Sequence, residues 1–447
     1  MNKITLSHAP FLIALVSIFF PILSGLLDIK LVHAIFIVIF LLSINLLFNN
    51  QKKILFYINL NTFVCFYVVI LLLVNLALGK GAVILSMGGY IIIYAFVFYL
   101  FFRTSKSISP FVVINYINII FKILIMSMML EFLLILLGYQ SILVLIIQGY
   151  KGHNGAGMLQ FMGYGGAQSG GLNSMLLGTQ IAGMLSVFST IWFISARACY
   201  KKKYFHKTGF FWIILSILLL ALTLNVTSGI LLVSAIIIWQ YYQLKRYKLF
   251  IFLLSFSFIS SLIYIYISSG YLFSRVFNNR QVNLTGNREF WNNYGLLHEV
   301  ENLTTIQFYV YNFIAPLKVF LSESYFNQLF GVGNKYVGNQ IFIGGDFAFG
   351  SMILFNGIIF SFLFAISIVY LLFQNINIYR YDSVDQRTWQ FIGFSCALIS
   401  ILFLISTIHY PQALSNLGGS VVFSLFIALA SYAKFRFNSL LISENEY

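Results

Sequence analysis

The chain has 447 residues, of which 60% are hydrophobic and 8% carry a charged side chain. A soluble domain carries roughly 25% charged residues, so this composition excludes the ordinary soluble class and indicates a protein of the lipid bilayer. The net charge is +15, which would also suit a nucleic-acid-binding protein. Most Lys and Arg side chains, however, stand in short segments between apolar runs, which is typical of membrane topology. We therefore expect no nucleic-acid partner.

Long apolar runs predict an all-α integral membrane protein with about 12 transmembrane helices. A bilayer interior cannot hydrogen-bond a backbone, so a chain crosses it as helices or as a closed barrel. Barrel strands alternate apolar and polar residues, whereas these runs are continuous. The runs are 10–27, 31–48, 54–78, 83–102, 111–137, 172–194, 210–224, 229–242, 249–268, 347–373, 389–408 and 419–433. No small-residue cleavage site follows the first run, which predicts a retained helix and not a signal peptide.

The basic residues predict the orientation of the helices, because cytoplasmic connections are enriched in Lys and Arg. With the N-terminus inside, alternate connections hold most of the 26 cations, and both termini are cytoplasmic. The segment 210–242 could be one long helix or two short ones, with polar residues at its middle. Two helices keep every basic connection on one side, so we favour a hairpin.

The runs divide the chain into three parts. Residues 1–268 hold the first nine helices and a glycine-rich outer loop at 138–171, and residues 346–447 hold the last three helices and a cytoplasmic tail. Between them, 269–345 form one large extracytoplasmic loop, and loops longer than about 15 residues are usually functional or disordered. Apolar residues recur there at helical spacing, for example Leu317 and Phe320. We expect short helices lying at the membrane surface.

The large loop concentrates charged and aromatic residues that could form a site for an anionic substrate. Arg288 suits a diphosphate, because a guanidinium pairs phosphate oxygens in a bidentate way. Trp291 and Tyr294 offer flat faces for sugar rings, and His298 and Glu299 offer a base. The alternative is a solvated loop surface, and a single loop histidine is more often merely solvated. Further outward cations are Arg275, Arg280, Lys335 and Lys151.

Other positions have both a functional and a structural interpretation. Gly331 and Gly333, in the turn-rich stretch LFGVGNKYVGN, allow close backbone approach. Asp346 precedes a predicted helix, where an N-cap role is as good an explanation as catalysis. Glu131 and Lys122 lie within an apolar run, and intramembrane charges are functional candidates. His409 is expected to face outward between the last two helices.

Three segments together resemble the O-antigen polymerase and ligase superfamily of bacterial glycan assembly. They are the NREFW segment, the LFGVGNKYVGN stretch and the DFAFGSMILFNGIIF stretch that follows the loop. Thr227-Ser228-Gly229 falls where these proteins often have Thr-x-Ser-Arg, with glycine in place of the arginine. The His-Asn that ligase-like members often show before the next helix is replaced by Gly345-Asp346, which favours the polymerase (Wzy-type) over the ligase.

The resemblance implies a metal-independent glycosyltransferase without a cofactor, acting at the outer face of the bacterial inner membrane. It would join oligosaccharide repeats carried on undecaprenyl diphosphate, alongside a flippase and a chain-length regulator in the same membrane. Arg288, with Arg275 or Arg280, would hold the diphosphate. His298, or else Asp346 or Glu299, would deprotonate the acceptor. Lys151 is the match to an arginine of the family's other outer loop.

Three other functions remain open from the sequence. A lipid-linked glycan flippase also has about 12 helices, but mostly short loops and several charges within its spans. An O-antigen ligase would share the loop and the lipid-linked donor. A scaffold or channel subunit would leave the clustered loop arginines unexplained.

Overall fold

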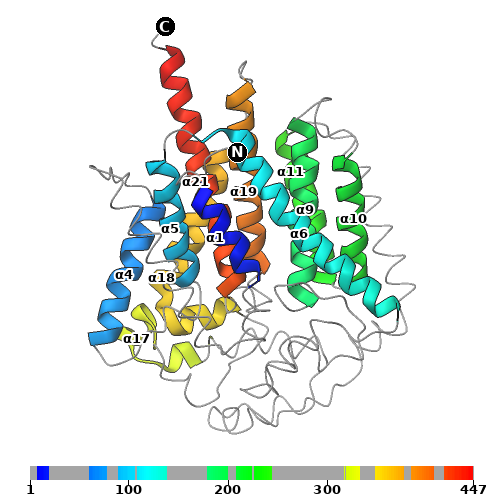
Figure 1. Cartoon of the computed structure of the whole chain (residues 1–447). Coiled ribbons are helices and arrows are strands. Elements are labelled where there is room, and N and C mark those ends of the chain that lie inside the picture. Colours follow the sequence, from blue (N-terminus) through cyan, green and yellow to red (C-terminus); the bar gives the residue numbers. More distant parts are fainter. Residues whose placement is uncertain are drawn as a thin grey trace.

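The computed structural model describes residues 8–19, 60–77, 89–105, 108–137, 179–199, 208–223, 226–243, 317, 319–332, 348–376, 384–406 and 417–445. Within these residues the secondary structure is helical and contains no strand (Figure 1). The helices are α1 (Ala9–Ile18), α4 (Leu60–Ala77), α5 (Gly89–Thr104), α6 (Pro110–Leu136), α9 (Thr179–Cys199), α10 (Thr208–Leu222), α11 (Val226–Gln243), α17 (Tyr325–Phe330), α18 (Ala348–Ile376), α19 (Val384–Ser406) and α21 (Leu417–Asn445).

Four of these helices are long and apolar enough to cross a membrane. The qualifying segments are Pro110–Leu133, Met352–Asn375, Val384–Ser406 and Gly419–Leu440. Shorter apolar helices accompany them at Ala9–Ile18, Ile91–Thr104, Ala182–Ala196 and Gly209–Leu222. The predicted helical membrane protein is thereby confirmed for the described residues. The predicted runs 31–48 and 249–268 lie outside them.

The segment 210–242 forms two helices, as predicted. Helix α10 ends at Leu222 and α11 begins at Val226. Both helices pack on α9, beside which they stand in Figure 1. Of the polar residues at the middle of the segment, Thr223 follows the end of α10, and Thr227, Ser228 and Gly229 lie in the first turn of α11.

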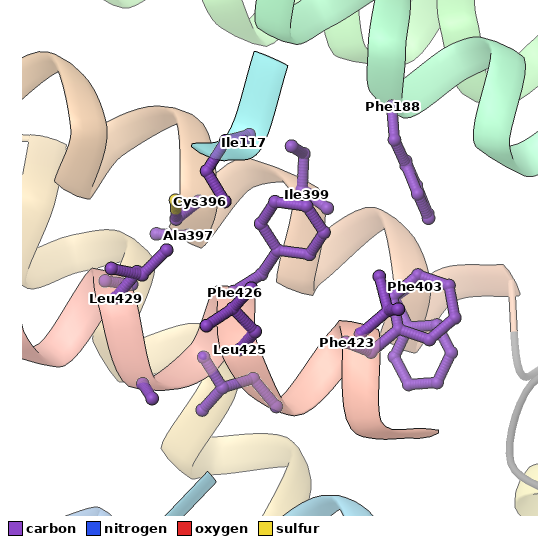
Figure 2. Close-up of a cluster of buried hydrophobic side chains, with 14 of the residues drawn as sticks. Ile117, Phe188, Cys396, Ala397, Ile399, Phe403, Phe423, Leu425, Phe426 and Leu429 are labelled. Carbon is purple, nitrogen blue, oxygen red and sulfur yellow. The ribbon is translucent and has the colours of Figure 1, made fainter. Parts of the chain in front are cut away.

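Helices α19 and α21 form the centre of the bundle and pack closely on each other. Figure 2 shows their shared core, into which α6 contributes Ile117 and α9 contributes Phe188. Aromatic rings of α21 dominate it: Phe423 stacks on Phe403 of α19 with centroids 4.0 Å apart, and Phe426 stacks on Phe121 of α6 at 5.6 Å. Such rings contribute to the packing through their large van der Waals contact area and their specific stacking geometry.

A few buried polar groups tie the helices together within this apolar packing. Ser424 of α21 donates to the carbonyl oxygen of Ile91 in α5 at 2.7 Å. Trp192 of α9 donates its indole N–H to the Asn118 amide oxygen in α6 at 2.8 Å. Small residues at helix interfaces and interhelical hydrogen bonds are typical of association in lipid, where the solvent itself is apolar.

The outward faces of the long helices carry exposed apolar side chains. On α18 the side chains of Phe362, Ile366 and Phe373 are each more than half exposed. On α10 those of Phe210 and Phe211 are also more than half exposed. A soluble protein rarely exposes contiguous apolar surface of this kind. We attribute these faces to contact with hydrocarbon chains.

Basic side chains gather where the end of α5, the end of α21 and the start of α19 meet. The Arg103 guanidinium lies 4.7 Å from the centroid of the Phe435 ring, and Arg436 is the next residue on α21. Trp389 packs edge-on against Tyr432 at 5.4 Å, which brings Arg387 of α19 to the same end. This basic end is the C-terminal end of α21, and α17 lies at the opposite end of the bundle (Figure 1).

Candidate functional site

The residues that the sequence predicts to carry chemistry lie outside the described part of the chain. They include every residue predicted to contact the diphosphate, the sugars or the acceptor. The structure therefore does not test whether these residues lie close to one another. They are Lys151, Arg275, Arg280, Arg288, Trp291, Tyr294, His298, Glu299, Lys335, Asp346 and His409. The described residues instead show how α17 and the two residues after it meet the helix bundle.

The segment that follows α17 docks on a break in helix α18. Helix α18 is interrupted at Gly357, whose φ of 83° and ψ of 166° are non-helical. The segment after α17 runs against this break, and the backbone N–H of Val332 donates to the carbonyl oxygen of Leu354 at 3.0 Å. That hydrogen bond holds the backbone at Val332 against α18, three residues before the break at Gly357.

Two glycines make this contact possible. Gly331 also has a positive φ, 85°, and a Cβ on it would lie 2.7 Å from the carbonyl carbon of Asn356. A Cβ on Gly357 would lie 2.7 Å from the backbone nitrogen of Gly331. Only glycine adopts this backbone region readily and leaves room for such an approach. We call this contact the glycine junction.

The prediction of close backbone approach at Gly331 is confirmed, whereas its partner Gly357 was missed. The run 347–373 was predicted as one uninterrupted helix, and that prediction is wrong at Gly357. The dipeptide Asn356-Gly357 was the available signal, because Asn-Gly commonly marks a turn or break.

Helix α17 begins at a side-chain cap and satisfies its own polar groups. The Ser324 hydroxyl accepts from the Asn327 backbone N–H at 3.4 Å, and the Asn327 side-chain amide donates to the Glu323 carboxylate at 2.8 Å. The Gln328 side-chain amide donates to the carbonyl oxygens of Leu321 and Glu323 at 3.1 and 2.9 Å. The polar side chains of this short segment thus turn back on its own backbone.

A second polar region lies in α6, α9 and the start of α11, in the half of the bundle away from the basic end. Glu131 of α6 is 2% exposed. One turn before it, Met128 contacts the Ser186 hydroxyl of α9 at 4.0 Å. Since Trp192 meets Asn118 and Ser186 meets Met128, α6 and α9 run antiparallel. Glu131 and Gly183 therefore lie at the same level.

At this level α9 and α11 approach each other closely. A Cβ on Gly183 would lie 2.5 Å from the Ser228 hydroxyl oxygen and 3.2 Å from that of Thr223. Ser228 belongs to the Thr227-Ser228-Gly229 segment that contributes to the family resemblance. Gly229, at the end of that segment, has open space where a Cβ would lie. The buried carboxylate and these hydroxyls make a polar layer within otherwise apolar helices.

Lys122, the other charge in α6, has an aromatic partner. Its ammonium nitrogen lies 5.3 Å from the centroid of the Trp212 ring in α10, within the range of a cation–π interaction. This contact gives the lysine a structural role in the α6–α10 packing. The described ranges contain no group of three or more His, Cys, Asp or Glu side chains placed to hold a metal ion.

Comparison of the whole chain with family models, with curated proteins and with solved structures finds no match. The family resemblance therefore rests on the motifs of the sequence.

Proposed function

We propose that this chain is a Wzy-type polymerase that joins lipid-linked oligosaccharide repeats at the outer face of the bacterial inner membrane. One observation carries the proposal. Two of the motifs that resemble the O-antigen polymerase superfamily, LFGVGNKYVGN and DFAFGSMILFNG, touch each other through Gly331 and Gly357. Motifs that act together in one site are expected to be neighbours in space, and these two are separated in sequence.

The proposed topology has twelve spans with both termini in the cytoplasm. The basic end formed by Arg103, Arg387 and Arg436 supports it, because cytoplasmic ends are enriched in arginine and lysine. Helix α17 and the glycine junction, at the other end, would then face the extracytoplasmic side. The large loop 269–345 would emerge there, where a polymerase needs its site.

In the proposed reaction, Arg288 with Arg275 or Arg280 binds the diphosphate of the donor lipid. His298 accepts the proton of a sugar hydroxyl on the acceptor repeat, with Glu299 or Asp346 as alternative bases. The hydroxyl oxygen attacks the anomeric carbon of the donor glycan and forms the new glycosidic bond. The carbon–oxygen bond to phosphate breaks, its electrons leave with the diphosphate, and the arginines stabilise that charge. The anomeric configuration inverts.

The remaining predicted residues would bind the two glycans. Trp291 and Tyr294 would stack on sugar rings, and Lys335, Lys151 and His409 would contact sugar or phosphate oxygens. No metal or cofactor is required in this scheme, because the cationic side chains stabilise the leaving group. A flippase and a chain-length regulator in the same membrane are the proposed partners.

A second candidate is a flippase for the same lipid-linked glycan, and two observations favour it. Helix α18 is broken at Gly357, and discontinuous helices mark the substrate sites of many transporters. Glu131 is a buried carboxylate within a candidate membrane span, and such residues often line transport paths. An O-antigen ligase is a third candidate, on the resemblance alone.

Complementation of a deletion strain separates these functions. Surface polysaccharide would be compared by gel for wild type, Arg288→Ala, His298→Ala and the control Arg246→Ala, which lies in a predicted cytoplasmic connection. A polymerase predicts single-repeat glycan on the lipid core in the deletion strain, in Arg288→Ala and in His298→Ala, with normal ladders in the control. Absence of all surface glycan in the deletion strain would contradict the polymerase and favour transport or ligation. Immunoblots of membranes would establish equal expression.

A further inference from the structure

We propose that the apolar face of α17 is inserted in the outer leaflet of the membrane and anchors the large loop there. The face consists of Tyr325, Phe326 and Leu329, which are 86%, 45% and 43% exposed. In a helix these three residues share one side, since positions i and i+4 are neighbours. The proposed occupant of this surface is lipid, at the boundary between hydrocarbon chains and headgroups. The inference holds for a polymerase and for a flippase alike.

The position of α17 along the bundle sets its depth. Helix α18 continues from Gly357 to the end of its candidate membrane span at Asn375. That distance is 18 residues, or about 27 Å at a rise of 1.5 Å per residue. The hydrocarbon core of a bilayer is roughly 30 Å thick. The glycine junction, and α17 directly before it, therefore lie close to the far edge of that core.

One flank of the exposed face of α17 is held by protein. Phe330 is partly buried against the hydrophobic core, and its ring lies 5.0 Å from that of Phe326. Helix α17 packs on α18, next to which it lies in Figure 1. The exposed face is thus presented by a helix that is packed along one flank on a membrane span.

The polar groups of this segment also fit insertion at the interface. Unsatisfied hydrogen-bonding groups are costly in lipid. The side-chain amides of Asn327 and Gln328 are bonded to Glu323 and to backbone carbonyl oxygens of the same segment. A short helix with one apolar side and internally bonded polar groups is typical of interfacial helices.

Spin labelling of the full chain in vesicles of phosphatidylethanolamine and phosphatidylglycerol tests this proposal. Labels would be placed at Tyr325→Cys and, separately, Leu329→Cys, in a chain with Cys65 and Cys199 replaced by alanine; Cys396 is fully buried and stays. Collision rates with oxygen, which concentrates in lipid, would be compared with those of a water-soluble nickel chelate. Ile366→Cys, on the exposed face of α18, is the lipid reference, and Val384→Cys, at the exposed start of α19, is the aqueous reference.

We expect an oxygen-to-nickel collision ratio at Tyr325 and Leu329 several-fold above that at Val384 and approaching that at Ile366. A ratio equal to that at Val384 would overturn the proposal, because the face would then be in water. Immobilised spectra with low collision rates for both reagents would also overturn it, because another part of the protein or a second copy would then cover the face. Two labelled positions guard against one variant that fails to fold.

Discussion

Gly331 and Gly357 face each other across the contact between the end of α17 and helix α18, and neither position has room for a Cβ. A side chain on Gly357 would meet the backbone nitrogen of Gly331, and one on Gly331 would meet the backbone at Phe355 and Asn356. Both glycines have φ near 85°. The contact brings the backbone after α17 against the backbone of α18, so its geometry depends on two residues that are 26 positions apart.

Substitution at the glycine junction is expected to destabilise the protein. Gly331→Ala and Gly357→Ala each force alanine into a backbone region that disfavours it by about 1–3 kcal/mol, and each adds a clash with backbone. The midpoint of thermal unfolding in detergent should fall for both variants. Gly229→Ala is the matched control, since its Cβ would meet nothing within 4 Å, and alanine is the better helix former by about 0.5–1 kcal/mol.

The two glycine substitutions should also be non-additive. Each one alone separates the same two backbones, so the double variant has little further contact to lose. A fall in the unfolding midpoint equal to the sum of the single effects would show that the two glycines act independently. If the control Gly229→Ala lowers the unfolding midpoint as much as Gly331→Ala does, the steric explanation is wrong.

The hydrogen bond between Trp192 and Asn118 should contribute measurably to the packing of α6 on α9. Asn118→Leu leaves the buried indole N–H without its acceptor, at a cost of about 1 kcal/mol. Trp192→Phe leaves the Asn118 amide oxygen without its donor. In a double-mutant cycle, Asn118→Leu with Trp192→Phe should lose less stability than the sum of the two single variants. Strict additivity would show that the bond contributes nothing.

The close approach of α9 and α11 predicts a compensating pair of substitutions. Gly183→Ala places a Cβ against the Ser228 side chain, at 2.5 Å from its oxygen and 3.0 Å from its Cβ, and should lower the thermal unfolding midpoint. Adding Ser228→Gly removes both atoms and should restore part of the loss. Ser228→Gly alone measures the helix propensity penalty of the new glycine, about 1 kcal/mol. If the unfolding midpoint of the double variant does not recover, the close approach of Gly183 to Ser228 is not the cause of the loss in Gly183→Ala.

Glu131 is expected to be needed for activity and not for folding. Glu131→Gln keeps the size of the side chain and removes its ionisable carboxyl group, and an ionisable residue buried in a membrane span is usually functional. Surface polysaccharide in the complemented deletion strain should fall, while the unfolding midpoint of the purified variant should stay at or above that of wild type. Full polysaccharide with unchanged stability would assign the carboxylate no functional role.

The helical membrane class could be predicted from the sequence because a lipid interior leaves a continuous apolar run no alternative to a helix. The run 111–137 became α6, Pro110–Leu136. The split into α10 and α11 was equally predictable, because basic connections constrain which ends share a side. The end of α21 was not predictable in this way. Its predicted run stops at residue 433, but the helix continues past Lys434 and Arg436 to Asn445. Helical hydrogen bonds do not require apolar side chains, so hydropathy underestimates a helix that leaves the membrane.

The sequence by itself determined the class of protein and the runs that became helices within the described residues, and it suggested the candidate residues Arg288 and His298, because composition and charge are local properties of the chain. Only the tertiary structure decided which residues meet. It paired Gly331 with Gly357, set Glu131 at the level of Gly183, and placed Lys122 over the ring of Trp212. Such pairings depend on how distant helices pack. A glycine at which two backbones approach has neither a charge nor an apolar side chain, so the sequence does not indicate which residue it will contact.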